Sequence, residues 1–264
     1  MAGGGPFRLS PGQWTDDTSM ALCLATSLLE RGGFDARDQM ERYCRWVETG
    51  YLSSTGTCFD VGLTVHAALQ SFRRTGEPLA GSTHPRSAGN GSLMRLAPVP
   101  MFFFPDVDAV EFYAGESSRT THGAPECLDA CRLFARMLWR ALSGRPKDEV
   151  AHGDADSFSG ASAIATIARG SYLSKSEAEV RGSGYVVESL EAALWCFMTT
   201  GTFEAAVLRA ANLGDDADTT AAVCGQVAGA FHGASRIPVR WLNRLARRSE
   251  IEDLADRLWS RHRA

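Results

Sequence analysis

Apolar residues recur along most of the chain at the three- to four-residue spacing of a helix. One broad stripe contains Met20, Leu24 and Leu28 and stops at Arg31-Gly32-Gly33, a basic last turn followed by glycine. No run alternates clearly between apolar and polar residues, as a half-buried strand would. The pattern therefore predicts an all-α protein, folded as one compact bundle over residues 1–264. Further helices are predicted around residues 40–47 and 61–72 and over 124–143, 185–199, 203–212, 218–233, 238–248 and 251–261.

Four breaks between these helices are rich in glycine or serine and end where a helix is predicted to begin. They span residues 10–18, 82–92, 181–185 and 212–219. The weakly polar stretch 144–160 is predicted to be an exposed loop. No domain linker and no internal repeat separates these segments.

The predicted helix 218–233 has small residues at four-residue spacing, including Gly225, Gly229 and Gly233. An interior glycine costs a helix about 1 kcal/mol relative to alanine. Several on one ridge predict a close approach, either by another helix backbone or by a ligand. Both readings place this helix at the centre of the fold.

Charge and composition exclude several classes of protein. The net charge is −4 and no long run of like charges occurs, so a nucleic-acid-binding surface is not expected. No apolar stretch approaches the roughly 18 residues that span a bilayer, and the first residues lack the apolar core of a signal peptide. Seven cysteines form no CxxC pair, which predicts reduced, packed thiols. A cytoplasmic protein is expected.

Two acidic segments carry the strongest chemical signal. Residues 14–18 read Trp-Thr-Asp-Asp-Thr, and residues 214–220 read Gly-Asp-Asp-Ala-Asp-Thr-Thr. Both contain carboxylates and hydroxyls with no His or Cys, an oxygen-only set that suits Mg²⁺ or Mn²⁺ better than zinc or copper. Thr and Asp are also good N-caps, so each segment alone could simply start a helix. Together they predict a two-metal site, because bound cations would relieve the repulsion among so many carboxylates.

A glycine-rich turn precedes Leu93 and could bind an anion. Residues 86–92 read Arg-Ser-Ala-Gly-Asn-Gly-Ser, and backbone N–H groups at such a turn can cradle phosphate. The same residue types also form ordinary turns. Residues 181–185 (Arg-Gly-Ser-Gly-Tyr) could likewise be either an anion-binding turn or an ordinary one. His122, in Thr-Thr-His-Gly before a predicted helix, either makes a backbone hydrogen bond or faces a nucleotide.

These motifs, in this order along the chain, resemble the ADP-ribosylglycohydrolase family, which includes the dinitrogenase reductase-activating glycohydrolases and the ADP-ribosyl-acceptor hydrolases. The resemblance covers essentially the whole chain and implies an all-α orthogonal bundle with a binuclear Mg²⁺ or Mn²⁺ centre. It implies metal ligands at Thr15, Asp16, Asp17, Asp216, Asp218 and Thr219. It implies substrate-binding residues at Ser87, Gly89, Asn90, Gly91 and His122. Asp60 resembles a position beside the distal ribose, whereas Asp215 is left outside the ligand set.

One departure from the family pattern bears on catalysis. Members usually open with a helix and a loop that carries a catalytic glutamate, but no acidic residue precedes Asp16 here. The chain is therefore expected to be incomplete at its N-terminus relative to the family, with an exposed apolar groove and an incomplete site. In place of that glutamate, the candidate catalytic carboxylates are Asp16, Asp17 and Asp60.

The resemblance implies a metal-dependent hydrolase that cleaves the glycosidic bond between ADP-ribose and an acceptor, either a protein side chain or a small molecule. Arginine, serine, a nucleobase and a metabolite remain open as acceptors. An ADP-ribose-binding protein without catalysis is the first alternative. A Mg²⁺-dependent terpenoid synthase is a remote one, because its aspartate motifs usually lie within helices around a large apolar cavity.

Overall fold

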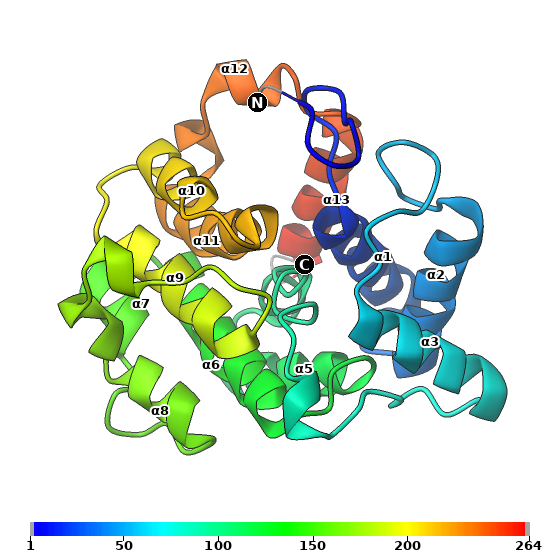
Figure 1. Ribbon diagram of the computed structural model, residues 1–264, viewed down its shortest axis with the longest axis horizontal. Coiled ribbons are helices and arrows are strands. Elements are labelled where there is room, and N and C mark those ends of the chain that lie inside the picture. The colour runs from blue at the N-terminus through cyan, green and yellow to red at the C-terminus, as the bar shows by residue number, and fades with distance from the viewer. Residues whose placement is uncertain (1–2, 262–264) are drawn as a thin grey trace.

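The computed structural model describes residues 3–261, and these residues form helices with no β-sheet, which confirms the all-α prediction (Figure 1). The α-helices are α1 (Asp16–Arg31), α2 (Ala36–Thr49), α3 (Leu63–Thr75), α4 (Pro98–Phe103), α5 (Val107–Arg119), α6 (Pro125–Leu142), α7 (Lys147–His152), α8 (Ser162–Ala168), α9 (Val186–Met198), α10 (Phe203–Asn212), α11 (Ala217–His232), α12 (Val239–Leu242) and α13 (Arg248–Ser260). Four short 3-10 turns span Pro85–Ser87, Ser171–Ser174, Glu177–Glu179 and Ala234–Arg236.

The glycine stop signals end helices where the sequence predicts. Gly32 follows α1 and Gly50 follows α2, each with φ of 68°. This left-handed conformation is strained for residues with a Cβ, so glycine is the usual choice at a helix end. At Gly50 space is also lacking, because an added Cβ would lie 2.1 Å from the carbonyl oxygen of Gly56.

Helix α6 packs against α5, α9 and α11 and lies in the lower part of the view in Figure 1. Its buried face includes Cys127, Cys131, Phe134 and Leu138, all at most 1% exposed. Every cysteine is unpaired, and all but the half-buried Cys58 are buried. The prediction of reduced, packed thiols is therefore confirmed.

At Gly225 and Gly229 of α11, no helix backbone makes the close approach that the glycine spacing predicts. A Cβ added at Gly225 would meet the Val207 side chain of α10 at 3.9 Å, and one at Gly229 would meet Phe203 at 3.8 Å. Both are ordinary van der Waals distances, so no backbone crosses the ridge there. Gly225 and Gly229 border an open groove instead.

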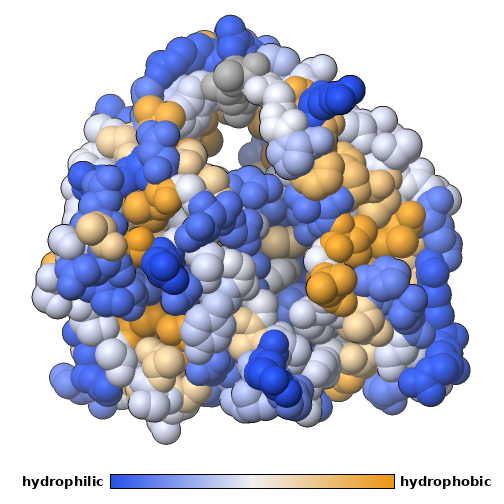
Figure 2. Space-filling model, viewed as in Figure 1, coloured by the Kyte–Doolittle hydropathy of each residue, from blue (hydrophilic) through white to orange (hydrophobic). Residues whose placement is uncertain are grey.

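This apolar groove lies between α1, α4, α11 and α13 and has a volume of about 440 Å³. Figure 2 shows an opening between these parts of the molecule. An exposed apolar groove is what the sequence leads us to expect. Its lining includes Ala21, Leu22, Ala25, Met101, Ala222, Gly225, Gly229, Ile251, Leu254 and Leu258.

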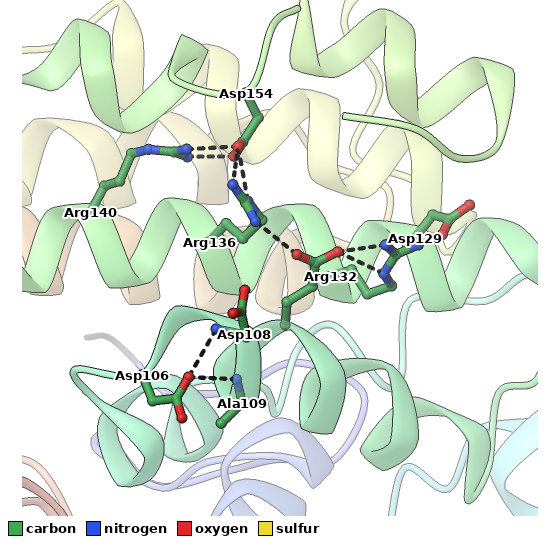
Figure 3. Close-up of polar contacts among 9 residues, drawn as sticks. Asp106, Asp108, Ala109, Asp129, Arg132, Arg136, Arg140 and Asp154 are labelled. Carbon is green, nitrogen blue, oxygen red and sulfur yellow. Dashed lines mark hydrogen bonds and ion pairs between the residues drawn. The ribbon is translucent and has the colours of Figure 1, made fainter. Parts of the chain in front are cut away.

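The prediction of an exposed loop over 144–160 is wrong. This stretch contains α7, and it buries Asp154 to 2% exposure against α6. The Asp154 carboxylate accepts hydrogen bonds from Arg136 and Arg140 (Figure 3). The Asp154 carboxylate can be buried because both arginines neutralise its charge. The polar composition of residues 144–160 does not reveal these partners.

The predicted helix 238–248 is also wrong as a single element. Helix α12 ends at Leu242, and α13 begins at Arg248, three residues before the predicted 251–261 helix. A tertiary contact accompanies the break: the Ala246 N–H donates to the Gly12 carbonyl 3.0 Å away rather than to its own helix. No helix within residues 3–261 is both long and apolar enough to cross a membrane.

Candidate functional site

The two acidic segments meet where α1 and α11 begin. Thr15 is the N-cap residue of α1, and its hydroxyl lies 3.0 Å from an Asp17 carboxylate oxygen and 2.9 Å from one of Asp218. Asp216 is the N-cap residue of α11. Neither the Thr15 nor the Asp216 side chain accepts a hydrogen bond from a backbone N–H of the helix that follows it. Simple helix capping therefore does not explain these residues.

The start of α1 is fixed by the loop that carries Asp60. The Trp14 N–H donates to the Ser54 hydroxyl at 3.1 Å, and that hydroxyl donates back to the Trp14 carbonyl at 2.7 Å. Six residues later Asp60 adopts φ of 60°, an uncommon conformation for a residue other than glycine. The loop thus brings Asp60 into the cavity beside Asp16.

A cavity of about 270 Å³ opens at this meeting point. It collects residues from six separate segments of the chain. Nine of the twelve predicted site residues line it, and Thr15, Asp17 and Ser87 do not. The lining contains Asp16, Asp60, Gly89, Asn90, Gly91, His122, Gly184, Asp216, Asp218 and Thr219, with Gly62, Leu63, Thr64, Val65 and Met94 completing the wall. Asp215 is exposed and does not line the cavity, in agreement with its exclusion from the predicted ligand set.

The carboxylates in and beside the cavity disfavour one another's ionisation. Burial, followed by the negative charges of Asp17, Asp60 and Asp218, raises the pKa of Asp16 to about 9. Burial and the charge of Asp218 raise the pKa of Asp17 to about 7. The pKa of Asp60 and that of Asp216 are also raised, in both cases chiefly by burial. Without a positive charge among them, these groups tend to hold protons.

Asp17 lies behind the cavity and faces the apolar groove rather than the cavity itself. It is only 4% exposed, and its Oδ1 atom is buried without a hydrogen-bond partner. A buried acceptor without a partner is costly. A cation bound between α1 and α11 would satisfy it.

The donor atoms are of the type that suits a hard divalent cation. Thr15, Asp16 and Asp17 supply oxygen atoms from one helix start, and Asp216, Asp218 and Thr219 supply them from the other. Within residues 3–261, however, no three His, Cys, Asp or Glu side chains stand in an arrangement ready to hold a metal ion. Like charges repel at short range, so the carboxylates stand apart and a cation would have to draw them together.

The glycine-rich turn is held against the second acidic segment. The Asn90 N–H donates to the Gly184 carbonyl at 3.0 Å, and the Asn90 side-chain amide donates to Asp216 at 2.8 Å. An isolated β-bridge joins Gly89 to Tyr185. The two ambiguous glycine turns of the sequence, 86–92 and 181–185, therefore form one wall of the cavity.

Ser87 does not belong to the acidic cavity. Its hydroxyl donates to the His84 carbonyl at 2.6 Å and contacts the Ser82 hydroxyl, which closes the short Pro85–Ser87 turn. Ser87 lines an adjoining cavity instead, together with Arg86, Glu126 and Tyr185. The two cavities share Thr64, Gly89 and Gly184 in their linings and are therefore adjacent.

His122 lines the cavity and is 2% exposed. Its ring lies against the glycine turn: a Cβ added at Gly91 would fall 2.8 Å from the ring carbon Cε1. Burial, together with the charge of Arg95, lowers the pKa of His122 to about 3, so the ring is neutral at pH 7. The backbone N–H donates to the Ser118 carbonyl at 2.7 Å, which confirms the backbone hydrogen bond, whereas the contact with a nucleotide stays a prediction.

Arg95 is a residue of this site that the sequence analysis passed over. It is fully buried behind the glycine turn and donates to the Gly91 carbonyl at 3.1 Å. Its guanidinium also lies over the Tyr43 ring, 4.8 Å from the ring centre. The available signal was one charged residue inside the apolar run Leu-Met-Arg-Leu-Ala-Pro-Val at 93–99.

Comparison with known proteins decides the family. The profile of the ADP-ribosylglycohydrolase family matches residues 1–264. The chain belongs to this family. It is a glycohydrolase, and the predicted resemblance is confirmed.

Two curated relatives and one solved structure of the family show the extent of the likeness. The ADP-ribosylarginine hydrolase Tri1 of Pseudomonas putida is 42% identical over 261 residues, covering 99% of this chain and 70% of the relative. The ADP-ribosyl-[dinitrogen reductase] glycohydrolase of Rhodospirillum rubrum is 31% identical, covering 96% of this chain and 80% of the relative. A structure described as an ADP-ribosylglycohydrolase-related protein complex superposes with a TM-score of 0.87 at 43% identity, covering 98% of this chain and 85% of that chain.

Proposed function

We propose that this glycohydrolase cleaves the N-glycosidic bond between ADP-ribose and an arginine side chain, using two Mg²⁺ or Mn²⁺ ions. The observation that carries the proposal is the contact between Thr15 and Asp218, 203 residues apart, at the edge of a cavity that also contains Asn90 and His122. Arginine is favoured as the acceptor because relatives at 42% and 40% identity are named ADP-ribosylarginine hydrolases. The seven unpaired cysteines support a reducing compartment such as the cytoplasm.

The adjoining cavities suit the two ends of ADP-ribose. The acidic cavity suits the ribose that carries the acceptor, since ribose hydroxyls are good partners for carboxylates and for cations. The Gly89–Gly91 turn suits the diphosphate, because its backbone and the buried Arg95 cation behind it favour an anion. The second cavity, with Tyr185 and Glu126 joined by a 2.7 Å hydrogen bond, suits the adenosine end.

The proposed ligands are Thr15, Asp16, Asp17, Asp216, Asp218 and Thr219. Bound there, the cations would supply positive charge that orients the ribose and lowers the pKa of a bound water. The N-termini of α1 and α11 both point toward this place, and their helix dipoles favour the ionised carboxylates.

Asp60 is the candidate acid–base, because it lines the cavity but lies outside the proposed ligand set. Burial and the charges of Asp218 and Asp216 raise the pKa of Asp60, so that its ionised carboxylate is a stronger base than an ordinary aspartate. In the reaction a water oxygen bonds to the anomeric carbon as the carbon–nitrogen bond breaks. The ionised Asp60 takes one proton from the water and passes it to the departing guanidine nitrogen, so that Asp60 is ionised again after the reaction. Positive charge that develops on the ribose is stabilised by the neighbouring carboxylates.

The two alternatives have less support. A protein that only binds ADP-ribose would not need so many raised-pKa carboxylates around one cavity. A terpenoid synthase would place aspartates within helices around a large apolar cavity, whereas Asp216 and Asp218 lie at a helix start beside glycine turns.

The acceptor is tested by incubating the protein with matched peptides that carry ADP-ribose on arginine or on serine, in Mg²⁺ or Mn²⁺, and measuring free ADP-ribose. Release from the arginine peptide at a rate at least about tenfold above the serine peptide is expected. Preference for serine would overturn the choice of arginine. Binding of ADP-ribose with no release from either peptide would favour the binding protein.

A further inference from the structure

Arg95 is a buried cation, and no hydrogen bond or ion pair joins it to a carboxylate of residues 3–261. Its two terminal nitrogens donate to the Gly91 and Ser117 carbonyls and to the hydroxyls of Thr120 and Thr121. A charge in the interior needs partners, and here neutral oxygens and the Tyr43 ring supply them. The shortest of these hydrogen bonds, 2.8 Å, goes to Thr121.

This bond fixes the direction of the next one. Arginine has only donors, so the Thr121 oxygen accepts from Arg95. The same oxygen lies 2.8 Å from Nδ1 of His122. The Thr121 hydroxyl has one proton to give, and among the described residues Nδ1 is its hydrogen-bonding neighbour besides Arg95. The Thr121 hydroxyl and Nδ1 are both satisfied when the hydroxyl donates to Nδ1, which leaves the ring proton of a neutral imidazole on Nε2.

The other edge of the His122 ring faces the glycine turn. A Cβ added at Gly91 would lie 3.2 Å from Nε2, and one added at Gly89 would lie 3.4 Å from it. Nε2 has no hydrogen-bond partner among residues 3–261, although the ring is almost entirely buried. It is therefore a free polar atom at the wall of the cavity.

We propose that Arg95 and Thr121 hold His122 as its Nε2–H tautomer, and that this N–H is the hydrogen-bond donor that the cavity presents to an oxygen atom of the ADP-ribosyl group. Arg95 and Thr121 are positioning residues, because they act through His122. The first half of the proposal concerns the free protein. The second half rests on the proposed function, because it needs ADP-ribose in the cavity.

The arrangement has a chemical advantage over a charged imidazolium. A neutral donor can bind a ribose or phosphate oxygen without adding a positive charge that would compete with cations at the carboxylates. The low pKa of His122 keeps the ring neutral across the physiological range. The opposite tautomer would offer a lone pair to the ligand oxygen, and the two acceptors would repel each other.

The test uses protein labelled with ¹⁵N at histidine and long-range ¹H–¹⁵N spectra of the His122 ring. Thr121→Val removes the hydroxyl at nearly constant shape, and Thr121→Ser is the matched control that keeps it. The wild type and Thr121→Ser are expected to show the Nε2–H tautomer. Thr121→Val is expected to show a mixture or the Nδ1–H form, and to bind ADP-ribose about 3- to 10-fold more weakly, as loss of one hydrogen bond predicts.

Two outcomes would overturn the tautomer assignment: an Nδ1–H tautomer in the wild type, or a folded Thr121→Val protein with an unchanged Nε2–H form. The proposed hydrogen bond from His122 to ADP-ribose is contradicted if ADP-ribose binds equally well to Thr121→Val and to the wild type. Failure of the proposed function looks different, since the Nε2–H tautomer would then be present in a wild-type protein that neither binds nor releases ADP-ribose.

Discussion

The side-chain amide of Asn90 donates to the Asp216 carboxylate at 2.8 Å and so joins the glycine turn to the start of α11, 126 residues later. The contact orients one of the proposed metal ligands. Groups that orient a ligand in this way usually matter 10- to 100-fold for metal affinity or activity. Metal binding in the cavity is therefore expected to depend on Asn90, even if Asn90 never contacts the cation.

Asn90→Ala is expected to weaken Mg²⁺ binding by about 10- to 100-fold, measured by calorimetry. Ser189→Ala is the matched control, because it removes only the longer 3.3 Å contact of the same amide and leaves the bond to Asp216. Equal Mg²⁺ affinity in Asn90→Ala and the wild type would show that Asp216 is not a ligand or needs no orientation.

The pKa of Asp16 predicts how stability depends on pH when no divalent cation is present. The folded-state pKa is about 9, whereas the ordinary value is 3.8. Above pH 4 the unfolded chain releases a proton that the folded protein retains, so the free energy of unfolding decreases as the pH rises toward 9. In EDTA, the melting temperature should accordingly fall between pH 5 and pH 9.

Asp16→Asn should flatten this slope, since the amide has no proton to release. Mg²⁺ should raise the melting temperature of the wild type more at pH 8 than at pH 6, because a bound cation displaces protons from the carboxylates. A melting temperature in EDTA that rises steadily to pH 9 would contradict the clustering of these acids.

Gly91 has no room for a side chain. A Cβ there would lie 2.8 Å from the His122 ring, closer than such contacts normally come. Gly91→Ala should push the ring away from the turn and weaken ADP-ribose binding, which fluorescence or calorimetry can measure. Gly62→Ala is the control, because Gly62 lines the same cavity but a Cβ there would meet nothing within 4 Å. An equal effect of both substitutions would contradict the role of the His122 position.

The ion-pair network on α6 has a structural role away from the cavity (Figure 3). Asp154 is 2% exposed and pairs with Arg136 and Arg140, and Arg136 also pairs with Glu111 of α5. Asp154→Ala removes the partner of Arg140 and one of the partners of Arg136. Removing one partner of a buried pair typically costs about 3–5 kcal/mol.

Urea denaturation of Asp154→Ala should therefore show a large loss in the free energy of unfolding. Asp253→Ala breaks the exposed pair with Arg257 on α13 and should cost about 1 kcal/mol or less. Similar losses for the two variants would show that the network contributes no more than a surface ion pair.

The sequence predicts the helices and the two acidic segments well, because both depend on local signals. The spacing of apolar residues reveals α1, α6 and α9, and helix starts rich in Thr and Asp reveal the site. The convergence of Asp16 and Asp218 is a property of the tertiary fold, which the composition of the two segments suggested and the resemblance to a family implied.

Two residues were not anticipated, because their partners lie far away in the sequence. Asp154 was expected in an exposed loop, but two arginines of α6 bury it. Arg95 was passed over because nothing near it in the chain shows that it becomes the fixed donor behind the cavity.

The central claim is that the meeting point of the two acidic segments is a metal-dependent hydrolytic site. Its most direct test is the rate of ADP-ribose release from an ADP-ribosylated arginine peptide by the wild type, Asp218→Asn and Asp215→Asn, in Mg²⁺ and in EDTA. We expect Mg²⁺-dependent release by the wild type and by Asp215→Asn, whose side chain lies outside the cavity, and at least about a 100-fold loss in Asp218→Asn. Asp218→Asn at the wild-type rate, or release unaffected by EDTA, would contradict the claim.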